Sequence, residues 1–143
     1  MNTKKKDIFA ELPTLFFTTR QIIRSKLPKD GHSDPNAWLR FETLRFIAES
    51  KRSTMQDVAH HLRIKAPSAT SLVGNLVRRS LIVRGGSVDK RVVSLSLTKA
   101  GMRQLDRYKA RARSAVRAVF SKLSDREVND LVAILRRVQK IHG

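Results

Sequence analysis

The segment that decides the fold reads STMQDVAHHLRIKAPSATSLVGNLVRRS (53–80) followed by LIVRGGSVDKRVVSLSLT (81–98). Thr54 stands three residues before Asp57, which is the spacing of an acidic capping box. This pair predicts the start of a short helix that ends near Leu62.

A second short helix is predicted to begin with Pro67 and to continue to about Ser80. It follows a turn at residues 63–65, and two short helices across such a turn are typical of a helix-turn-helix motif. One face repeats at helical spacing and should lie in the core: Ala69, Leu72, Val73 and Leu76. The opposite face is our candidate DNA-contacting surface: Ser68, Ser71, Asn75 and Arg78. A polar outer face is also what any surface helix shows.

Two β-rich segments follow, at residues 81–84 and 92–97, with turn residues at 85–87 between them. The second segment places Val93, Leu95 and Leu97 on one face. The pattern predicts a β-hairpin.

Helices are predicted on both sides of this segment. The first is placed over residues 12–26 with Pro13 in its first turn; the alternative is a short helical turn that precedes a kink at Pro13. The second uses Asp34 as N-cap and Pro35 as first position to reach about Ser50. The buried side of the second helix is expected to include Trp38, Phe41, Leu44, Ile47 and Ala48.

Thr98 is predicted to cap a long helix over residues 99–122, and Ser124 with Glu127 forms a full capping box for a last helix. The inner side of the long helix should hold Met102, Leu105, Ala112, Val116, Val119 and Leu123. The last helix carries a seam of Val128, Leu131, Leu135 and Val138.

Composition limits the function. Lys and Arg outnumber Asp and Glu by 30 to 12, and a net charge of +18 on 143 residues favours a polyanionic partner. No uncharged run approaches the roughly 20 residues of a spanning helix, and no long apolar segment follows the basic N-terminus, so we expect a cytoplasmic, nucleoid-associated protein.

Several chemistries have no support in the sequence. There is no Cys, and the adjacent His60 and His61 cannot easily hold one metal ion on a helix. No phosphate-binding glycine loop, nucleophile elbow or paired-carboxylate motif is visible. We therefore expect neither an enzyme nor a cofactor or metal site.

The stretch 37–101 resembles the MarR family of winged helix-turn-helix transcription regulators. The resemblance rests on Arg84 after the second short helix, on Asp89-Lys90-Arg91 at the wing tip, and on Leu97-Thr98-x-x-Gly101 at its exit. It implies a mainly α fold with a small β-hairpin wing. One MarR-like domain over 1–143 would comprise a DNA-binding part at 36–98 and dimerisation helices at 8–27 and 99–142.

The resemblance implies a set of DNA-binding residues: Ser68, Thr70, Ser71, Asn75, Arg78, Arg84, Asp89, Lys90 and Arg91. An arginine at the wing tip suits a narrow minor groove, and Asp89 would orient it. An ion pair that only holds the turn is the alternative. Gly74, Val77 and Ser80 depart from the family pattern, and Ser80 stands where a glycine is common.

Family members often bind small aromatic anions, which implies a possible effector pocket here: Phe16, Arg20, Trp38, Phe41 and Arg45. Ordinary core packing is the alternative reading of these residues. We expect a homodimeric, sequence-specific regulator of double-stranded DNA, a repressor on a pseudo-palindromic operator. The alternatives are a nonspecific architectural protein and a regulator controlled by a protein partner without a ligand.

Overall fold

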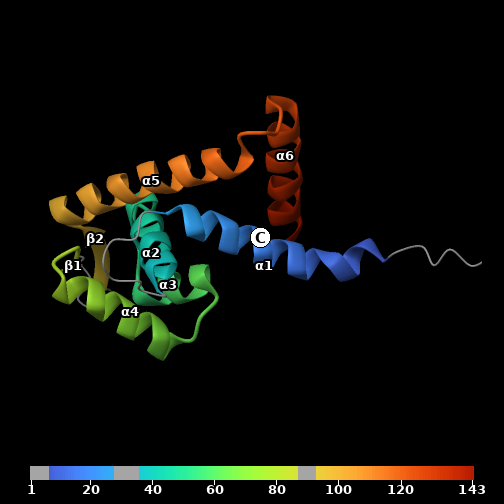
Figure 1. The fold of residues 1–143 in the computed structure, drawn as a ribbon. Helices are drawn as coiled ribbons and strands as arrows, with labels where there is room; N and C mark the ends of the chain where they lie inside the picture. The colour runs from blue at the N-terminus through green and yellow to red at the C-terminus, as the bar shows by residue number, and fades with distance from the viewer. Residues whose placement is uncertain (1–6, 28–35, 87–92) are drawn as a thin grey trace, which may run out of the picture. The chain divides into compact units, whose positions relative to one another are not determined.

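A computed structural model describes residues 7–27, 36–86 and 93–143 (Figure 1). Helices and strands follow the order α1 (Ile8–Lys26), α2 (Ala37–Glu49), α3 (Met55–Leu62), α4 (Ala66–Arg78), β1 (Ile82–Gly86), β2 (Val93–Leu97), α5 (Lys99–Phe120) and α6 (Asp125–His142). The predicted fold class, mainly α with a small β-hairpin, is confirmed.

The chain divides into two compact units. Residues 29–110 form the first, which we call the winged unit because it holds α2, α3, α4, the hairpin and the first half of α5. Residues 1–28 and 111–143 form the second, which we call the terminal unit. The predicted DNA-binding part at 36–98 thus lies within a unit that extends into α5.

The core of the winged unit is built by one apolar side of each helix and by the hairpin. Its fully buried side chains include Val58 on α3, Val73 and Leu76 on α4, Ile82 on β1 and Leu105 on α5. Phe41 adds an aromatic contact, because its ring stacks on that of Tyr108 with centroids 4.2 Å apart. The core-facing side predicted for α4 is confirmed by Ala69, Val73 and Leu76, and Leu72 is half-buried.

The hairpin is antiparallel, with Ile82 opposite Leu97 and Gly86 opposite Val93. Gly85 and Gly86 therefore belong to β1, and the prediction that they form the turn is wrong; Ser87 lies outside the described residues. Ser53 joins Leu95 through an isolated bridge. Leu95 is buried, whereas Val93 is exposed and Leu97 half-buried, so only part of the predicted strand face meets the core.

Two helix starts differ from expectation. Helix α1 begins at Ile8 and not near residue 12, because the Asp7 side chain accepts a hydrogen bond from the Phe9 N–H at 3.0 Å and caps an earlier turn. Pro13 consequently lies inside the helix, beyond its first turn. Helix α2 begins after Asn36, and the predicted cap at residues 34–35 lies outside the described part of the chain.

Five predicted core side chains are exposed in the chain alone: Trp38, Ala48, Met102, Val116 and Leu123. Helical spacing identifies the apolar side of a helix but not how much of that side a neighbouring element covers. Phe41, Leu44 and Ile47, one turn further along α2 than Trp38, are buried as predicted.

The terminal unit buries little of its apolar surface. No residue of α1 or α6 is buried in the chain by itself, although both helices carry large apolar side chains. The capping box of Ser124 and Glu127 is present as predicted, and it fixes the start of α6. The side chains of this unit therefore need a further surface to cover them.

None of the helices in the described part of the chain combines the length and the apolar character needed to cross a membrane.

Candidate nucleic-acid interface

The helix-turn-helix begins with a closed cap. The Thr54 hydroxyl accepts from the Asp57 N–H at 3.2 Å, and the Asp57 carboxylate accepts from the Thr54 N–H at 2.9 Å. Both bonds satisfy backbone donors that a helix start leaves unpaired. The predicted capping box is confirmed, and it fixes where α3 starts.

The turn between α3 and α4 depends on Arg63. This residue adopts a left-handed backbone conformation with φ 54°, and its N–H bonds to the Ala59 and His60 carbonyl oxygens. The Ile64 N–H also returns to Ala59 at 3.1 Å. Three residues, 63–65, therefore connect α3 to α4, as the sequence predicts.

Helix α4 starts without a side-chain cap. Lys65 is its N-cap and makes no capping hydrogen bond through its side chain, and Pro67 in the first turn has no N–H. The Ala66 and Ser68 N–H groups have no intrahelical acceptor at these positions. Such donors, with the positive end of the helix dipole, suit a phosphate group.

The candidate contact residues lie on the outward side of α4. Ser68, Ser71 and Arg78 are exposed, and Asn75 is half-buried. Thr70 is exposed too, but its hydroxyl donates to the Ala66 carbonyl oxygen at 3.0 Å. Ser68, Ser71, Asn75 and Arg78 therefore share one side of α4, whereas Thr70 is turned away from that side and its hydroxyl hydrogen is already used.

Gly74 also belongs to this surface, although it was not among the predicted contact residues; the sequence left open whether it permits close approach to DNA or is only tolerated in the helix. A Cβ at position 74 would meet, beyond its own helix backbone, only the Arg78 guanidinium at 3.4 Å, which is an ordinary contact. The fold therefore does not need a glycine here. Its i+3 spacing from Ser71 on the polar side was the sequence signal that could have placed it.

The wing is joined to α5 by a set of backbone contacts at its base. Ser80 adopts a left-handed conformation with φ 58°, and its carbonyl oxygen accepts from the Thr98 hydroxyl at 2.6 Å. The same hydroxyl accepts from the Gly101 N–H at 3.0 Å, and the Thr98 N–H donates to the Leu81 carbonyl at 3.1 Å. These bonds hold the start of α5 against the start of β1 and so fix the hairpin beside α4.

The positive φ of Ser80 explains why a glycine is favoured at this position. It also explains why α4 ends at Arg78, before the predicted end, since a left-handed residue cannot continue a right-handed helix.

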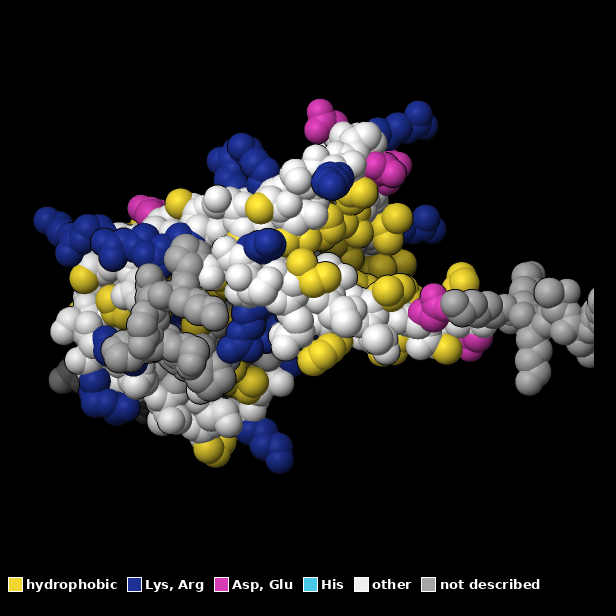
Figure 2. Space-filling model, in the orientation of Figure 1, with side chains coloured by type: hydrophobic (Ala, Val, Ile, Leu, Met, Phe, Trp, Pro, Cys, Tyr) yellow, Lys and Arg dark blue, Asp and Glu magenta, His cyan; other side chains and the backbone are white. Residues whose placement is uncertain are grey.

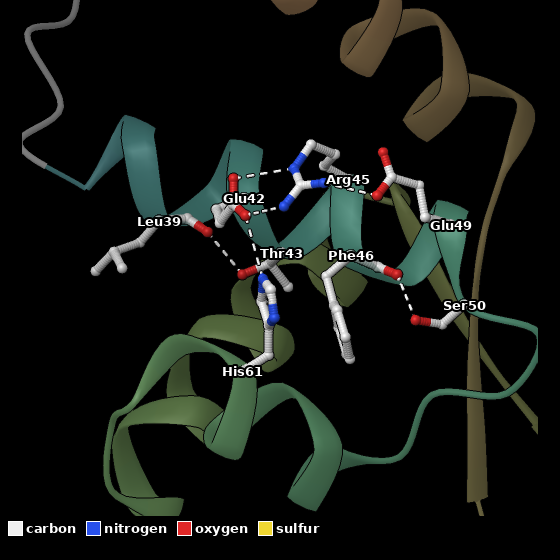
Figure 3. Close-up of polar contacts among 8 residues, drawn as sticks. All are labelled: Leu39, Glu42, Thr43, Arg45, Phe46, Glu49, Ser50 and His61. Atoms are coloured by element: carbon white, nitrogen blue, oxygen red, sulfur yellow. Dashed lines mark hydrogen bonds and ion pairs between the residues drawn. The ribbon is translucent and has the colours of Figure 1, made fainter. Parts of the chain in front are cut away.

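Helix α2 holds α3 through a polar cluster (Figure 3). The Arg45 guanidinium donates to Glu42, at 3.1 Å through Nε, and to Glu49 at 2.6 Å. The His61 Nε2 of α3 lies 3.1 Å from Glu42 Oε1, and its ring stacks on Phe46 with centroids 4.2 Å apart. The cluster connects the first helix of the motif to the core helix behind it.

The ionisation of this cluster follows from the same contacts. Hydrogen bonds from Arg45 lower the pKa of Glu42 below its usual value, against the opposing effect of burial. The Glu42 partner also raises the pKa of Arg45. Both side chains are therefore charged at neutral pH.

Arg84 is exposed on β1, as expected for a residue that reaches a ligand. The predicted tip residues Asp89, Lys90 and Arg91 lie outside the described residues.

The five candidate effector residues have different environments. Phe41 is buried in the core, and Arg45 already binds two carboxylates. Trp38 is 51% exposed, with its ring 5.8 Å from that of Phe41. Phe16 and Arg20 are exposed on α1. Within residues 7–27, 36–86 and 93–143 no group of three or more acidic or His side chains could hold a metal ion.

No family model matches the sequence. No curated protein matches it either.

Solved structures do resemble this chain over nearly its full length. A MarR family protein from Bacillus stearothermophilus is 21% identical, with a TM-score of 0.76 over 100% of this chain and 99% of that one. The PcaV transcriptional regulator from Streptomyces coelicolor, solved with its natural ligand, is 16% identical, with a TM-score of 0.69 over 100% and 99%. BpsR from Bordetella bronchiseptica, whose DNA binding is regulated by 6-hydroxynicotinic acid, is 16% identical, with a TM-score of 0.68 over 98% of both chains.

The chain has the MarR fold. The agreement extends over the helix-turn-helix, the hairpin and the flanking helices, so the resemblance drawn from the wing motif is confirmed at the level of the fold. In this MarR fold α4 occupies the second position of the helix-turn-helix, which is the recognition helix of such motifs.

Proposed function

We propose that this protein is a sequence-specific regulator of transcription that binds double-stranded DNA as a homodimer. The observation that carries the proposal is the outward surface of α4, where Ser68, Ser71 and Arg78 are exposed and where the helix start beside Ser68 has no side-chain cap. A protruding helix with short polar side chains fits a major groove, and its first N–H groups suit a backbone phosphate.

The contacts divide by chemistry. Asn75 carries the amide that can pair with adenine through two hydrogen bonds, and the serine hydroxyls can contact bases or phosphates. Arg78, late in the helix, is assigned to a phosphate, and Arg91 of the wing to the adjacent minor groove. Arg84 adds positive charge at the hairpin.

The homodimer is supported by the apolar surface of the terminal unit. Figure 2 shows hydrophobic side chains gathered over α1 and α6. Their exposed members are Ile8, Phe9, Leu12, Leu15, Phe16, Phe17, Ile22, Val132, Ile134, Leu135, Val138 and Ile141. Soluble monomers rarely expose a contiguous surface of this kind, and a second copy would cover it by symmetry.

Regulation by a small aromatic anion is part of the proposal, with repression as the sense of control. The regulation of BpsR by 6-hydroxynicotinic acid and the ligand complex of PcaV support it. The candidate residues stay Phe16, Arg20, Trp38, Phe41 and Arg45, of which Phe16, Arg20 and Trp38 have exposed side chains. Phe41 and Arg45 would act indirectly. Phe41 would act through its packing in the core, and Arg45 through its ion pairs with Glu42 and Glu49.

The net charge of +18 favours a second candidate function, that of an architectural DNA-binding protein without base preference. DNA binding at raised salt distinguishes the two candidate functions. A specific regulator still discriminates between sequences under this condition, whereas an architectural protein releases all DNA together.

Two substitutions in α4 test the docking. Asn75→Ala should relax base preference within the bound site, while Arg78→Ala should weaken binding to all sequences similarly, by about 1 kcal/mol. Fluorescence anisotropy with the preferred duplex and single-base variants of it measures both. Unaltered base preference in Asn75→Ala would contradict this placement of α4.

A further inference from the structure

The outward side of α5 carries a row of positive charge that the proposed DNA contact does not use. Lys99, Arg103 and Arg107 stand four residues apart in the half of α5 that belongs to the winged unit, and all three are exposed. In a helix this spacing puts successive side chains about 6 Å apart on one side. Figure 2 shows Lys and Arg side chains along α5.

No ion pair neutralises these charges among the described residues of the winged unit. Asp106 is the one acidic residue of α5, against seven basic residues: Lys99, Arg103, Arg107, Lys109, Arg111, Arg113 and Arg117. In the part of the chain that the structure describes, Lys99, Arg103 and Arg107 form no ion pair. Like charges at this spacing repel, so the helix carries a row that an external anion would stabilise.

The row does not belong to the α4 surface. Within the winged unit the hairpin lies between α4 and the start of α5 (Figure 1), and the Thr98 hydroxyl bonds to the Ser80 carbonyl oxygen at 2.6 Å, just after α4. Leu105 of α5 is fully buried in the same core cluster as Val73 and Leu76 of α4, and helical spacing puts the row on the opposite side of α5, facing away from that core. A duplex docked on α4 therefore leaves the α5 row free.

The chemistry of the row fits a phosphate backbone. Its three side chains are charged, and the apolar residues Ala100, Leu105 and Tyr108 of this half of α5 contact the core, whereas Met102 is exposed. A helix that binds a membrane surface inserts several large apolar side chains between its charges, and this half of α5 exposes one, Met102. An extended row of cations matches a strand of DNA, whose phosphates repeat along it.

We propose that the row of Lys99, Arg103 and Arg107 binds the backbone of a second DNA duplex, so that the protein bridges two segments. This inference rests on the proposed function, because it needs a first duplex on α4. The α5 row should bind the second duplex without base preference, because phosphate contacts carry no sequence information.

A bridging experiment with the full chain tests it. A random-sequence duplex of about 40 bp is immobilised, protein is bound, and retention of a second, fluorescent duplex is measured. Lys99→Gln/Arg103→Gln/Arg107→Gln should hold the first duplex as the unsubstituted protein does but retain the second about tenfold less, because three phosphate contacts are lost. The logarithmic salt slope of second-duplex retention should decrease by about 2.7.

A control of equal charge loss uses exposed residues of α6. Arg126→Gln/Arg136→Gln/Lys140→Gln should bridge like the unsubstituted protein. Equal bridging by both triple variants would overturn the inference, as would retention of phosphatidylserine vesicles in place of the second duplex. Loss of first-duplex binding in the α5 variant but not in the α6 variant would also overturn the inference, because it would show that the α5 row contacts the first duplex. Failure of the unsubstituted protein to bind any duplex would instead refute the proposed function.

Discussion

Gly101 lies so close to Leu81 that a Cβ at position 101 would sit 2.1 Å from the Leu81 carbonyl oxygen. Real side chains do not approach a backbone oxygen so closely, so the start of α5 and the start of β1 can meet only through a glycine. The contact sits beside the hydrogen bonds of Thr98 and holds the wing in place.

Gly101→Ala should therefore destabilise the fold by about 1–3 kcal/mol, because backbone must shift to admit the methyl group. Thermal unfolding followed by circular dichroism measures the change. Gly74→Ala is the matched control, since it adds the same methyl group inside a helix but in open surroundings. The control should stabilise the protein by about 0.5–1 kcal/mol. Equal melting temperatures for the two variants would show that the Leu81 contact does not constrain the wing.

Gly74→Ala should also weaken binding to the preferred duplex, by roughly 3- to 10-fold. Gly74 lies between Ser71 and Arg78 on the outward side of α4, where a bare backbone permits close approach to the groove floor. Anisotropy titration measures this. An unchanged affinity in the more stable variant would mean that α4 does not approach DNA at this point.

The Glu42 cluster should make the free energy of unfolding depend on pH in the acidic range. Because the pKa of Glu42 is lowered in the folded protein, its ionised form stabilises the fold above its ordinary pKa of 4.5, and this contribution disappears as pH falls through the lowered value. Glu42→Gln should cost about 1 kcal/mol at pH 7 and progressively less below pH 4.5.

Urea unfolding of Glu42→Gln and of the unsubstituted protein across this pH range provides the comparison. Glu49→Gln serves as the control, because that carboxylate is more exposed and contacts Arg45 alone. If the difference between Glu42→Gln and the unsubstituted protein stayed constant with pH, ionisation of Glu42 would not contribute to the stability of the fold.

The buried Ser53 hydroxyl offers a further test. Among the side chains that the structure describes, its Oγ is buried without a hydrogen-bond partner, which is costly. Ser53→Ala should raise the free energy of unfolding by about 1 kcal/mol, because the Ser53 backbone bond to the Leu95 N–H at 2.8 Å remains. A loss of stability in this variant would show that the hydroxyl has a partner, such as a bound water.

Local signals explain what could be predicted from the sequence. Each capping box, Thr54 with Asp57 and Ser124 with Glu127, spans only three residues, so a short segment defines it completely. The helix-turn-helix and the hairpin followed from such signals. The α4 surface followed as well, because residues on one side of a helix share a period.

Tertiary contacts explain what could not be predicted. His61 meets Glu42 across 19 positions of sequence, and nothing in either segment indicates that pairing. The close approach of Gly101 to Leu81 likewise depends on how two elements cross. Trp38 carried the right period but lies in the first turn of α2, beyond the point where the core covers that helix.

Selection of binding sites from a random duplex pool at two salt concentrations tests the central claim most directly. A homodimer with α4 as recognition helix predicts a two-fold symmetric consensus at both salts, with half-sites about 10 bp apart and A·T-rich flanks where the wings lie. Arg91→Ala should lose the flank preference and keep the half-sites. If the bound duplexes show no consensus at low salt and no duplex is bound at high salt, the result would contradict sequence-specific regulation and favour the architectural function.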